Sequence, residues 1–293
     1  MDRRPRPPRR VPPLRAPALL ALSLAFLALV GFGPTLAAPE SGAEEHASGG
    51  DLAAARTPAR AETPAGSATG PVVVGGRPLR SCTATGRNWR FTGSKQRREV
   101  ALTFDDGPSP FTPRILDVLE RERVRATFFL VGVHVPGGTA VMRRVLQEGS
   151  MIGNHSYSHA DLSRDAGLAS HELTKTNMLI RYATGFTPCL FRAPYGAVSP
   201  RLLQQARHRG MLTIQWNVDP EDYRGTDGRG VADRVVQAAK PGAIIVMHDG
   251  GGQRSVTVSA LHSIIKRLRH RGYKLVTVDQ LLGVQRSSRP PAA

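Results

Sequence analysis

The feature that most constrains the fold is a repeated alternation of short apolar segments with amphipathic segments after residue 98. The apolar segments are rich in β-branched and aromatic residues, a composition that favours strands. The expected strands are "EVALTF" (99–104), "ATFFLVG" (126–132), "SMIGNHS" (150–156), "CLFRAPYG" (189–196), "MLTIQWNVD" (211–219), "GAIIVMHD" (242–249) and "KLVTVDQLL" (274–282).

The segments between these strands place apolar residues at helical spacing, as Ile115, Leu116, Val118 and Leu119 illustrate. Strands that alternate with helices predict an α/β fold with crossover connections and a mostly parallel sheet. Because no dinucleotide-binding fingerprint follows any strand, we favour a closed or nearly closed barrel over an open sheet. The other expected helices span 139–149, 165–183, 199–209, 228–239 and 257–271.

The N-terminal third of the chain has a different composition. Residues 1–38 combine an arginine-rich start, an apolar run at 16–33 and small residues at a cleavage position, which predicts a secretory signal. An uncleaved membrane anchor formed by the same run is the alternative. Residues 39–76 are expected to form a disordered linker, and 77–98 an extension that packs on the domain. The protein is therefore expected to be secreted or extracytoplasmic, or anchored to the outer face of the membrane.

The formal net charge of +17 raises the question of a nucleic-acid partner. No basic segment is interleaved with stacking aromatic residues and no zinc-finger spacing occurs, so we expect no nucleic acid as a partner. A basic surface also suits an anionic environment such as a cell wall or a membrane surface. Cys82 and Cys189 are the two cysteines of the chain, too few for a metal site of their own. In an exported protein they could form one disulfide, which the sequence leaves open.

Ionisable residues gather where the expected strands end. Because the carboxyl ends of parallel strands meet at one edge of a sheet, where active sites assemble, we expect these side chains to lie together. They are Asp105, Asp106, His155, His159, Arg192, Asp219, Asp222, His248 and Asp249.

The segment "NHSYSH" carries two histidines four residues apart, His155 and His159. This spacing would place both imidazoles on one side of a helical turn, where they could share one cation. A carboxylate from another strand end would complete three ligands. One of the neighbours Asp105 and Asp106 could bind that cation, while the other acts as a base.

Five segments resemble, in order and spacing, the motifs of the polysaccharide deacetylases of carbohydrate esterase family four, the NodB-homology domain. The resemblance covers residues 97–283, and residues 284–293 would then form a disordered tail. It implies a distorted (β/α) barrel of about seven parallel strands. The segments are "TFDDGP" (103–108), "HSYSH" (155–159), "RAPYG" (192–196), "WNVDPEDY" (216–223) and "IVMHD" (245–249).

The resemblance also implies a division of roles. Asp105 would be the general base, oriented by Arg192. One divalent metal ion, zinc or else cobalt or another divalent ion, would be held by Asp106, His155 and His159.

The remaining implied roles concern the leaving group and the substrate pocket. His248 would be the general acid, tuned by Asp222, and the backbone N–H of Tyr195 would stabilise the oxyanion. Tyr223 stands where tryptophan is common in the family, and Val246 where leucine is usual. Both would line the pocket for the acetyl methyl group.

The function implied is removal of N-acetyl groups from an N-acetylglucosamine-containing polysaccharide, peptidoglycan or chitin-like, with release of acetate by a monomer. An O-acetyl xylan esterase with the same site is the alternative, and a non-catalytic carbohydrate-binding protein is a third. The tract "GGGQRS" (250–255) lacks the spacing of a phosphate-binding loop, so we interpret it as a flexible loop beside the site.

Overall fold

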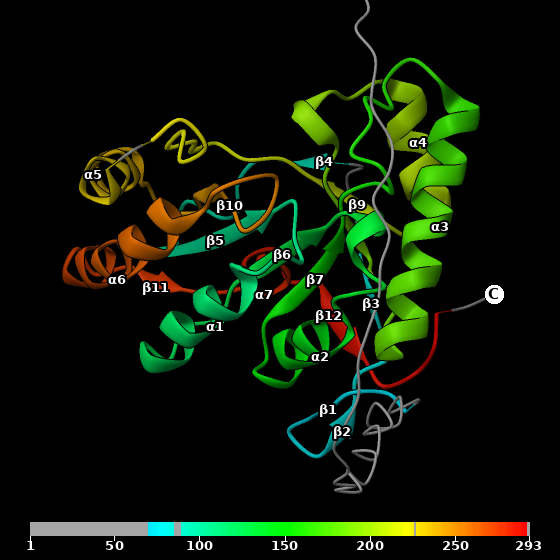
Figure 1. Cartoon of the computed structure of the whole chain (residues 1–293), viewed down its shortest axis with the longest axis horizontal. Coiled ribbons are helices and arrows are strands. Elements are labelled where there is room, and N and C mark those ends of the chain that lie inside the picture. Colours follow the sequence, from blue (N-terminus) through cyan, green and yellow to red (C-terminus); the bar gives the residue numbers. More distant parts are fainter. Residues whose placement is uncertain (1–69, 85–88, 226, 292–293) are drawn as a thin grey trace, which may run out of the picture. The chain divides into compact units, whose positions relative to one another are not determined.

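The computed structural model describes residues 70–84, 89–225 and 227–291 (Figure 1). The signal or anchor expected at 1–38 lies outside these residues, and so do residues 39–69 of the expected linker. None of the described helices is long and apolar enough to cross a membrane.

Among the described residues, seven parallel strands form one continuous hydrogen-bonded path, in the order β10-β5-β6-β7-β8-β9-β4, and β11 pairs with β5 beside it. A parallel bridge between Val218 and Ile245 brings the chain beyond β9 against β10, so the sheet curls back on itself. The predicted distorted (β/α) barrel is confirmed. The strands are β4 (Trp89–Arg90), β5 (Glu99–Asp105), β6 (Thr127–Leu130), β7 (Met151–Asn154), β8 (Leu190–Phe191), β9 (Leu212–Ile214), β10 (Ile244–His248) and β11 (Lys274–Leu275).

Six longer helices fill the crossovers and contact one another in the order α5, α6, α1, α2, α3, α4 among the described residues. Figure 1 shows them around the outside of the sheet. Each turns its apolar stripe inward, and side chains of Asp165, Ser199 and Asp227 cap α3, α4 and α5. The helices are α1 (Thr112–Arg121), α2 (Thr139–Gln147), α3 (Ala166–Thr184), α4 (Pro200–His208), α5 (Gly228–Ala238) and α6 (Ser255–His270), with short η1 (Gly132–His134), η2 (Pro194–Gly196) and α7 (Val278–Leu282).

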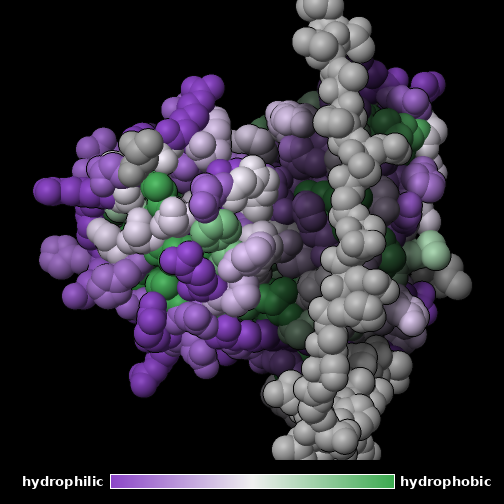
Figure 2. All heavy atoms as spheres, in the orientation of Figure 1, coloured by the Kyte–Doolittle hydropathy of each residue, from purple (hydrophilic) through white to green (hydrophobic). Residues whose placement is uncertain are grey.

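The strands are buried on both faces, as expected where helices cover a parallel sheet. In β5 every residue after Glu99 is buried, and Phe104 stacks on Phe128 of β6 with ring centroids 5.1 Å apart. Each such side chain contributes about 1.5–3 kcal/mol by its removal from water. Hydrophilic side chains cover most of the visible face over α1, α5 and α6 (Figure 2). The strand ends that carry ionisable residues therefore rest on a rigid, apolar frame.

The two ends of the described chain differ from the boundaries expected above. Residues 284–287, expected in a disordered tail, include β12 (Gln285–Ser287), which pairs antiparallel with β3 (Ser81–Thr83). Within the expected linker, Val72 is buried, and β1 (Val73–Val74) pairs with β2 (Arg77–Pro78). β3 and β12 are far apart in sequence, so local composition gives no signal for their pairing.

A disulfide joins Cys82 to Cys189, with their Cα atoms 5.4 Å apart. It ties β3 of the N-terminal extension to the residue that precedes β8. The pairing that the sequence leaves open is therefore present in the structure.

Candidate active site

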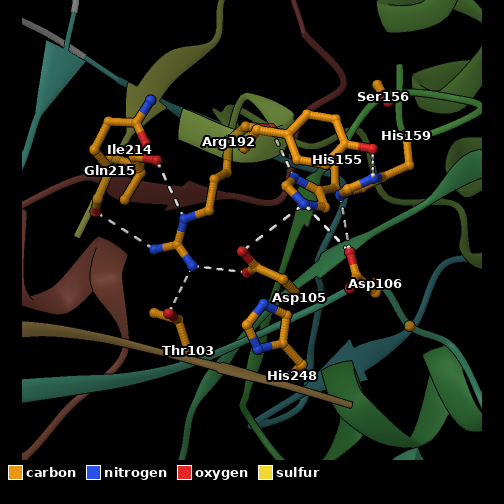
Figure 3. Close-up of polar contacts among 12 residues, drawn as sticks. Thr103, Asp105, Asp106, His155, Ser156, His159, Arg192, Ile214, Gln215 and His248 are labelled. Atoms are coloured by element: carbon orange, nitrogen blue, oxygen red, sulfur yellow. Dashed lines mark hydrogen bonds and ion pairs between the residues drawn. The ribbon is translucent and has the colours of Figure 1, made fainter. Parts of the chain in front are cut away.

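Most of the predicted residues line one cleft at the carboxyl ends of the strands, and Figure 3 shows several of them. Arg192, Asp222 and Asp249 do not line the cleft, but Arg192 contacts Asp105 and Asp222 contacts His248. Asp105 ends β5 and pairs in register with His248 at the end of β10, while His155 and Arg192 follow β7 and β8 directly. The cleft has a volume of about 440 Å³. It is lined by Asp105, Asp106, His155, His159, Tyr195, Trp216, Asp219, Tyr223, Val246, His248 and Arg254.

One group in the cleft could hold a metal ion: Asp106, His155 and His159, whose ligand atoms all lie within 4.8 Å of one another. The Oδ1 atom of Asp106 lies 3.2 Å from Nε2 of His159 and 3.5 Å from Nε2 of His155. Burial by itself raises the pKa of Asp106, but hydrogen bonds and positive charge from the neighbouring imidazoles in their protonated form outweigh it and lower the pKa well below its ordinary value. The carboxylate is therefore ionised.

The donor set fits a divalent cation. Nδ1 of His155 lies 2.8 Å from the carbonyl oxygen of Arg192, so in the neutral ring Nδ1 carries the proton and Nε2 presents its lone pair to Asp106. Within the described residues, Oδ1 of Asp106 is buried and accepts no hydrogen bond of good geometry. Electron-pair donors that face one point without a proton between them suit a cation, and two imidazoles with one carboxylate suit zinc.

The loop that carries both histidines is not the helical turn that their spacing predicts. Residues 155–159 are irregular, and Ser156 and His159 have positive φ values of 66° and 60°. The buried carboxylate of Glu172 on α3 holds this loop, because it accepts hydrogen bonds from the backbone N–H groups of Tyr157 and Ser158. The two imidazoles converge through this loop geometry instead of through helical periodicity.

Arg192 is completely buried and reaches Asp105 across the barrel. Its Nη1 donates to Oδ1 of Asp105 and to Oγ1 of Thr103, both at 2.7 Å, while Nε and Nη2 donate to the carbonyl oxygens of Ile214 and Gln215. Burial lowers the pKa of Arg192, and the charge of Asp105 opposes that shift. Figure 3 shows Asp105 between the guanidinium and His155.

His248 is held by Asp222. Nδ1 of His248 lies 2.7 Å from Oδ1 of Asp222, whose Oδ2 accepts from the His248 backbone N–H and from the Thr257 hydroxyl. Burial by itself lowers the pKa of His248, but the hydrogen bond and charge of Asp222 raise it above its ordinary value. Nε2 is thus the ring nitrogen that Asp222 does not engage, and the ring keeps its proton to higher pH than an ordinary histidine does.

The family comparison agrees with this geometry. A family model described as polysaccharide deacetylase matches residues 92–214. The chain is 35% identical over 196 residues to a peptidoglycan-N-acetylglucosamine deacetylase of Bacillus cereus, covering 66% of this chain and 71% of that one. This chain belongs to the polysaccharide deacetylase family.

Two further similarities extend this membership. The deacetylase chain is 37% identical over 198 residues to a chitooligosaccharide deacetylase of Bradyrhizobium sp., covering 63% of this chain and 90% of that one. It superposes with a TM-score of 0.66 on the crystal structure of the Bc1960 peptidoglycan N-acetylglucosamine deacetylase. That match has 33% identity and covers 68% of this chain and 95% of the other.

The cleft of this deacetylase is lined in part by Tyr195, Tyr223 and Val246, which the family resemblance assigns to oxyanion stabilisation and to the substrate pocket. The Tyr195 backbone has a φ of 59°, and its hydroxyl lies 3.2 Å from Nδ1 of His159. Tyr223 packs edge-on against His248 with ring centroids 5.3 Å apart, and the buried Val246 lies on β10. Tyr195 is 72% exposed, so its ring is free to contact a ligand that is larger than an acetyl group.

Sequence reasoning missed two residues of the cleft of this deacetylase. Trp216 opens the fourth motif, and its ring lies 5.6 Å from the guanidinium of Arg192. Arg254 belongs to the tract interpreted as a flexible loop, yet it is only 7% exposed. No single-residue pattern distinguishes a buried arginine at such a position from a solvated one. The glycines before it were the available signal, since they permit close packing.

Proposed function

We propose that this chain is a metal-dependent hydrolase that removes N-acetyl groups from an N-acetylglucosamine-containing polysaccharide and releases acetate. The observation that carries the proposal is one cleft that holds three convergent metal-ligand candidates, with a carboxylate on one side and a carboxylate-bound imidazole on the other. Hydrolysis of an amide needs a base, charge stabilisation on the carbonyl oxygen and a proton for the amine.

Asp106, His155 and His159 would hold the divalent ion, zinc being the ion best suited to this donor set and cobalt the next. When bound, such an ion supplies Lewis-acid polarisation of the acetyl carbonyl oxygen. The hydrogen bond from His155 Nδ1 to the Arg192 carbonyl oxygen keeps Nε2 aimed at the site.

Asp105 would take the proton from the attacking water. Arg192 binds Oδ1 of Asp105, so Oδ2 is left as the proton acceptor. The same Oδ2 lies 3.8 Å from Nε2 of His155, which places it beside the metal-ligand candidates. The fixed guanidinium orients the base, and the Tyr195 backbone N–H would donate to the developing oxyanion.

His248 would deliver the proton to the leaving amine. Its Nδ1 is engaged by Asp222, so Nε2 is the donor. The raised pKa lets the ring keep its proton to higher pH than an ordinary histidine does, as suits a general acid.

The chemistry of the cleft and the names of the relatives support the proposed substrate class. The named relatives act on peptidoglycan and on chitooligosaccharide, and the rings of Tyr195 and Tyr223 offer exposed faces on which sugar rings could stack. A disulfide suits an oxidising compartment, which supports an extracytoplasmic location at the cell wall. The apolar run at 16–33 would be the signal or the anchor, and the enzyme would act as a monomer.

The test is acetate release from a defined panel: an N-acetylglucosamine oligomer, peptidoglycan and acetylated xylan. We expect release from the N-acetylated substrates, loss of release after treatment with a chelator, and recovery on addition of zinc. Release from xylan alone would replace the proposal by an O-acetyl esterase. Glycan binding without release from any substrate would indicate a non-catalytic protein.

A further inference from the structure

The backbone directly after β10 packs unusually closely against Asp106. A Cβ atom added to Gly250 would lie 2.1 Å from the carbonyl oxygen of Asp106. A Cβ atom added to Gly251 would lie 2.6 Å from Oδ2 of the same residue. Glycine is therefore required at both positions for steric reasons, and the pair forms a wall against one side of the Asp106 backbone and carboxylate.

Asp106 needs such support because its own backbone is strained. Its φ of 74° lies in the left-handed region, which a residue with a side chain rarely adopts. Its Oδ1 faces His155 and His159, while its Oδ2 faces Gly251. Displacement of Gly251 would open the side of the carboxylate opposite the imidazoles.

Arg254 holds this wall through hydrogen bonds to its backbone. Its Nε donates to the carbonyl oxygen of Gly250 at 2.6 Å, and its Nη2 donates to that of Gly251 at 3.0 Å. Nη1 donates to the carbonyl oxygen of Gln253 at 3.2 Å. A buried guanidinium that binds three carbonyl oxygens of one short loop fixes the course of that loop, since a planar fork sets both distance and direction.

We propose that Arg254 is a positioning residue that locks Gly250 and Gly251 against Asp106 and so holds the Asp106 carboxylate toward His155 and His159. The inference rests on the proposed function, because it assigns Asp106 to the metal site. It assigns a task to the tract that sequence reasoning interprets as flexible. Arg254 also lines the cleft, and the role proposed for it is exerted through the glycine wall.

The experiment measures zinc affinity of the metal-stripped full chain by competition with a chromophoric chelator, without reference to activity. Loss of an outer support of a metal ligand typically costs 10–100-fold in affinity, so we expect about that loss for Arg254→Gln. Arg254→Lys keeps the charge without the fork and should fall between wild type and Arg254→Gln. Gly251→Ala should weaken zinc binding to a similar degree, because its methyl group would displace Oδ2 of Asp106.

Gly252→Ala is the matched control. Gly252 also has positive φ, at 137°, but a Cβ atom there would meet only Arg254 atoms at 3.8–3.9 Å and would not reach Asp106. Backbone strain alone would therefore harm Gly252→Ala at least as much as Gly251→Ala. The thermal midpoint of each metal-free variant, measured in parallel, identifies any variant whose fold is damaged.

Asp106→Asn distinguishes a failure of the proposed metal site from a failure of the positioning role of Arg254. If Asp106→Asn leaves zinc affinity unchanged, the metal site of the proposed function is wrong. If Asp106→Asn weakens zinc binding but Arg254→Gln and Gly251→Ala bind zinc as wild type does, the positioning role of Arg254 is overturned. Equal losses in Gly251→Ala and Gly252→Ala would also overturn it, because strain would then explain the effect.

Discussion

Nη1 of Arg192 lies 2.7 Å from Oδ1 of Asp105, and both side chains are almost fully shielded from solvent. Water cannot replace either partner at this depth, so each charge depends on the other. The pair links the end of β8 to the end of β5 across the barrel. It therefore joins the architecture of the sheet to the chemistry proposed for Asp105.

Removal of the Arg192 guanidinium should destabilise the folded protein. Arg192→Met leaves a buried carboxylate unpaired, and loss of one partner of such a pair costs about 3–5 kcal/mol of folding free energy. Urea denaturation followed by circular dichroism measures this loss. Arg201→Met on the exposed face of α4 is the control and should change stability by less than about 0.5 kcal/mol. An equally small loss of folding free energy in Arg192→Met would show that the buried Asp105 does not depend on the guanidinium.

The pH profile of acetate release should depend on Asp222. Asp222 raises the pKa of His248, and the proposed acid works only while protonated, so activity should decline as pH rises through that pKa. Asp222→Asn removes the raising charge, and the basic limb of the kcat/KM profile should move to lower pH. A basic limb that stays in place in Asp222→Asn would mean that His248 is not the titrating acid.

Asp249 should make stability depend on pH. Burial, together with the charges of Asp106 and Asp105, raises the pKa of Asp249 to about 7 although Gly107 and Thr112 donate hydrogen bonds to its carboxylate. The folded state therefore holds this proton more tightly than the unfolded state does. The contribution of Asp249 to stability is present below the unfolded pKa of 3.8 and falls as pH rises toward 7.

The asparagine of Asp249→Asn cannot ionise, so this variant should not lose stability in this way as pH rises. The measurement is the free energy of unfolding of the wild type and of Asp249→Asn at several pH values between 4 and 8. The difference between the two proteins should change in favour of the variant as pH rises. A difference that does not vary with pH would show that Asp249 titrates normally in the folded chain.

The disulfide should contribute to stability without a role in the reaction. Cys82 and Cys189 are 107 residues apart, and a cross-link of such a loop contributes on the order of 2–5 kcal/mol. A variant with both cysteines changed to alanine should unfold at lower urea concentration, and a reductant should affect the wild type alone. The kcat of the double-alanine variant at low temperature should match that of the wild type, because neither cysteine lines the cleft. An unchanged urea midpoint would contradict this contribution.

The barrel and the meeting of the site residues could be predicted because both depend on short-range patterns. Apolar runs locate β5 and β10, and the residues that end them, Asp105 and His248, must lie at one sheet edge once the strands are parallel. The roles of individual residues came from the family resemblance, since spacing alone did not distinguish Asp105 from Asp106 as the metal ligand.

The remaining features depend on contacts that are distant in sequence. The conformation of the loop that carries His155 and His159 depends on hydrogen bonds to the carboxylate of Glu172. The conformation of β12 depends on its pairing with β3, so neither is encoded by the local sequence. Arg254 is part of a polar, glycine-rich tract that is typical of a mobile loop. Its burial arises only because two glycines let the chain approach Asp106.

The most direct test of the central claim compares Asp105→Asn with Asp106→Asn in two assays, zinc affinity and acetate release from an N-acetylglucosamine oligomer. Asp105→Asn should bind zinc nearly as the wild type does and lose at least about a hundredfold in kcat, since general-base catalysis contributes about 10²–10⁴-fold. Asp106→Asn should lose zinc affinity and activity together. Undiminished acetate release by Asp105→Asn, or undiminished zinc affinity in Asp106→Asn, would contradict the account.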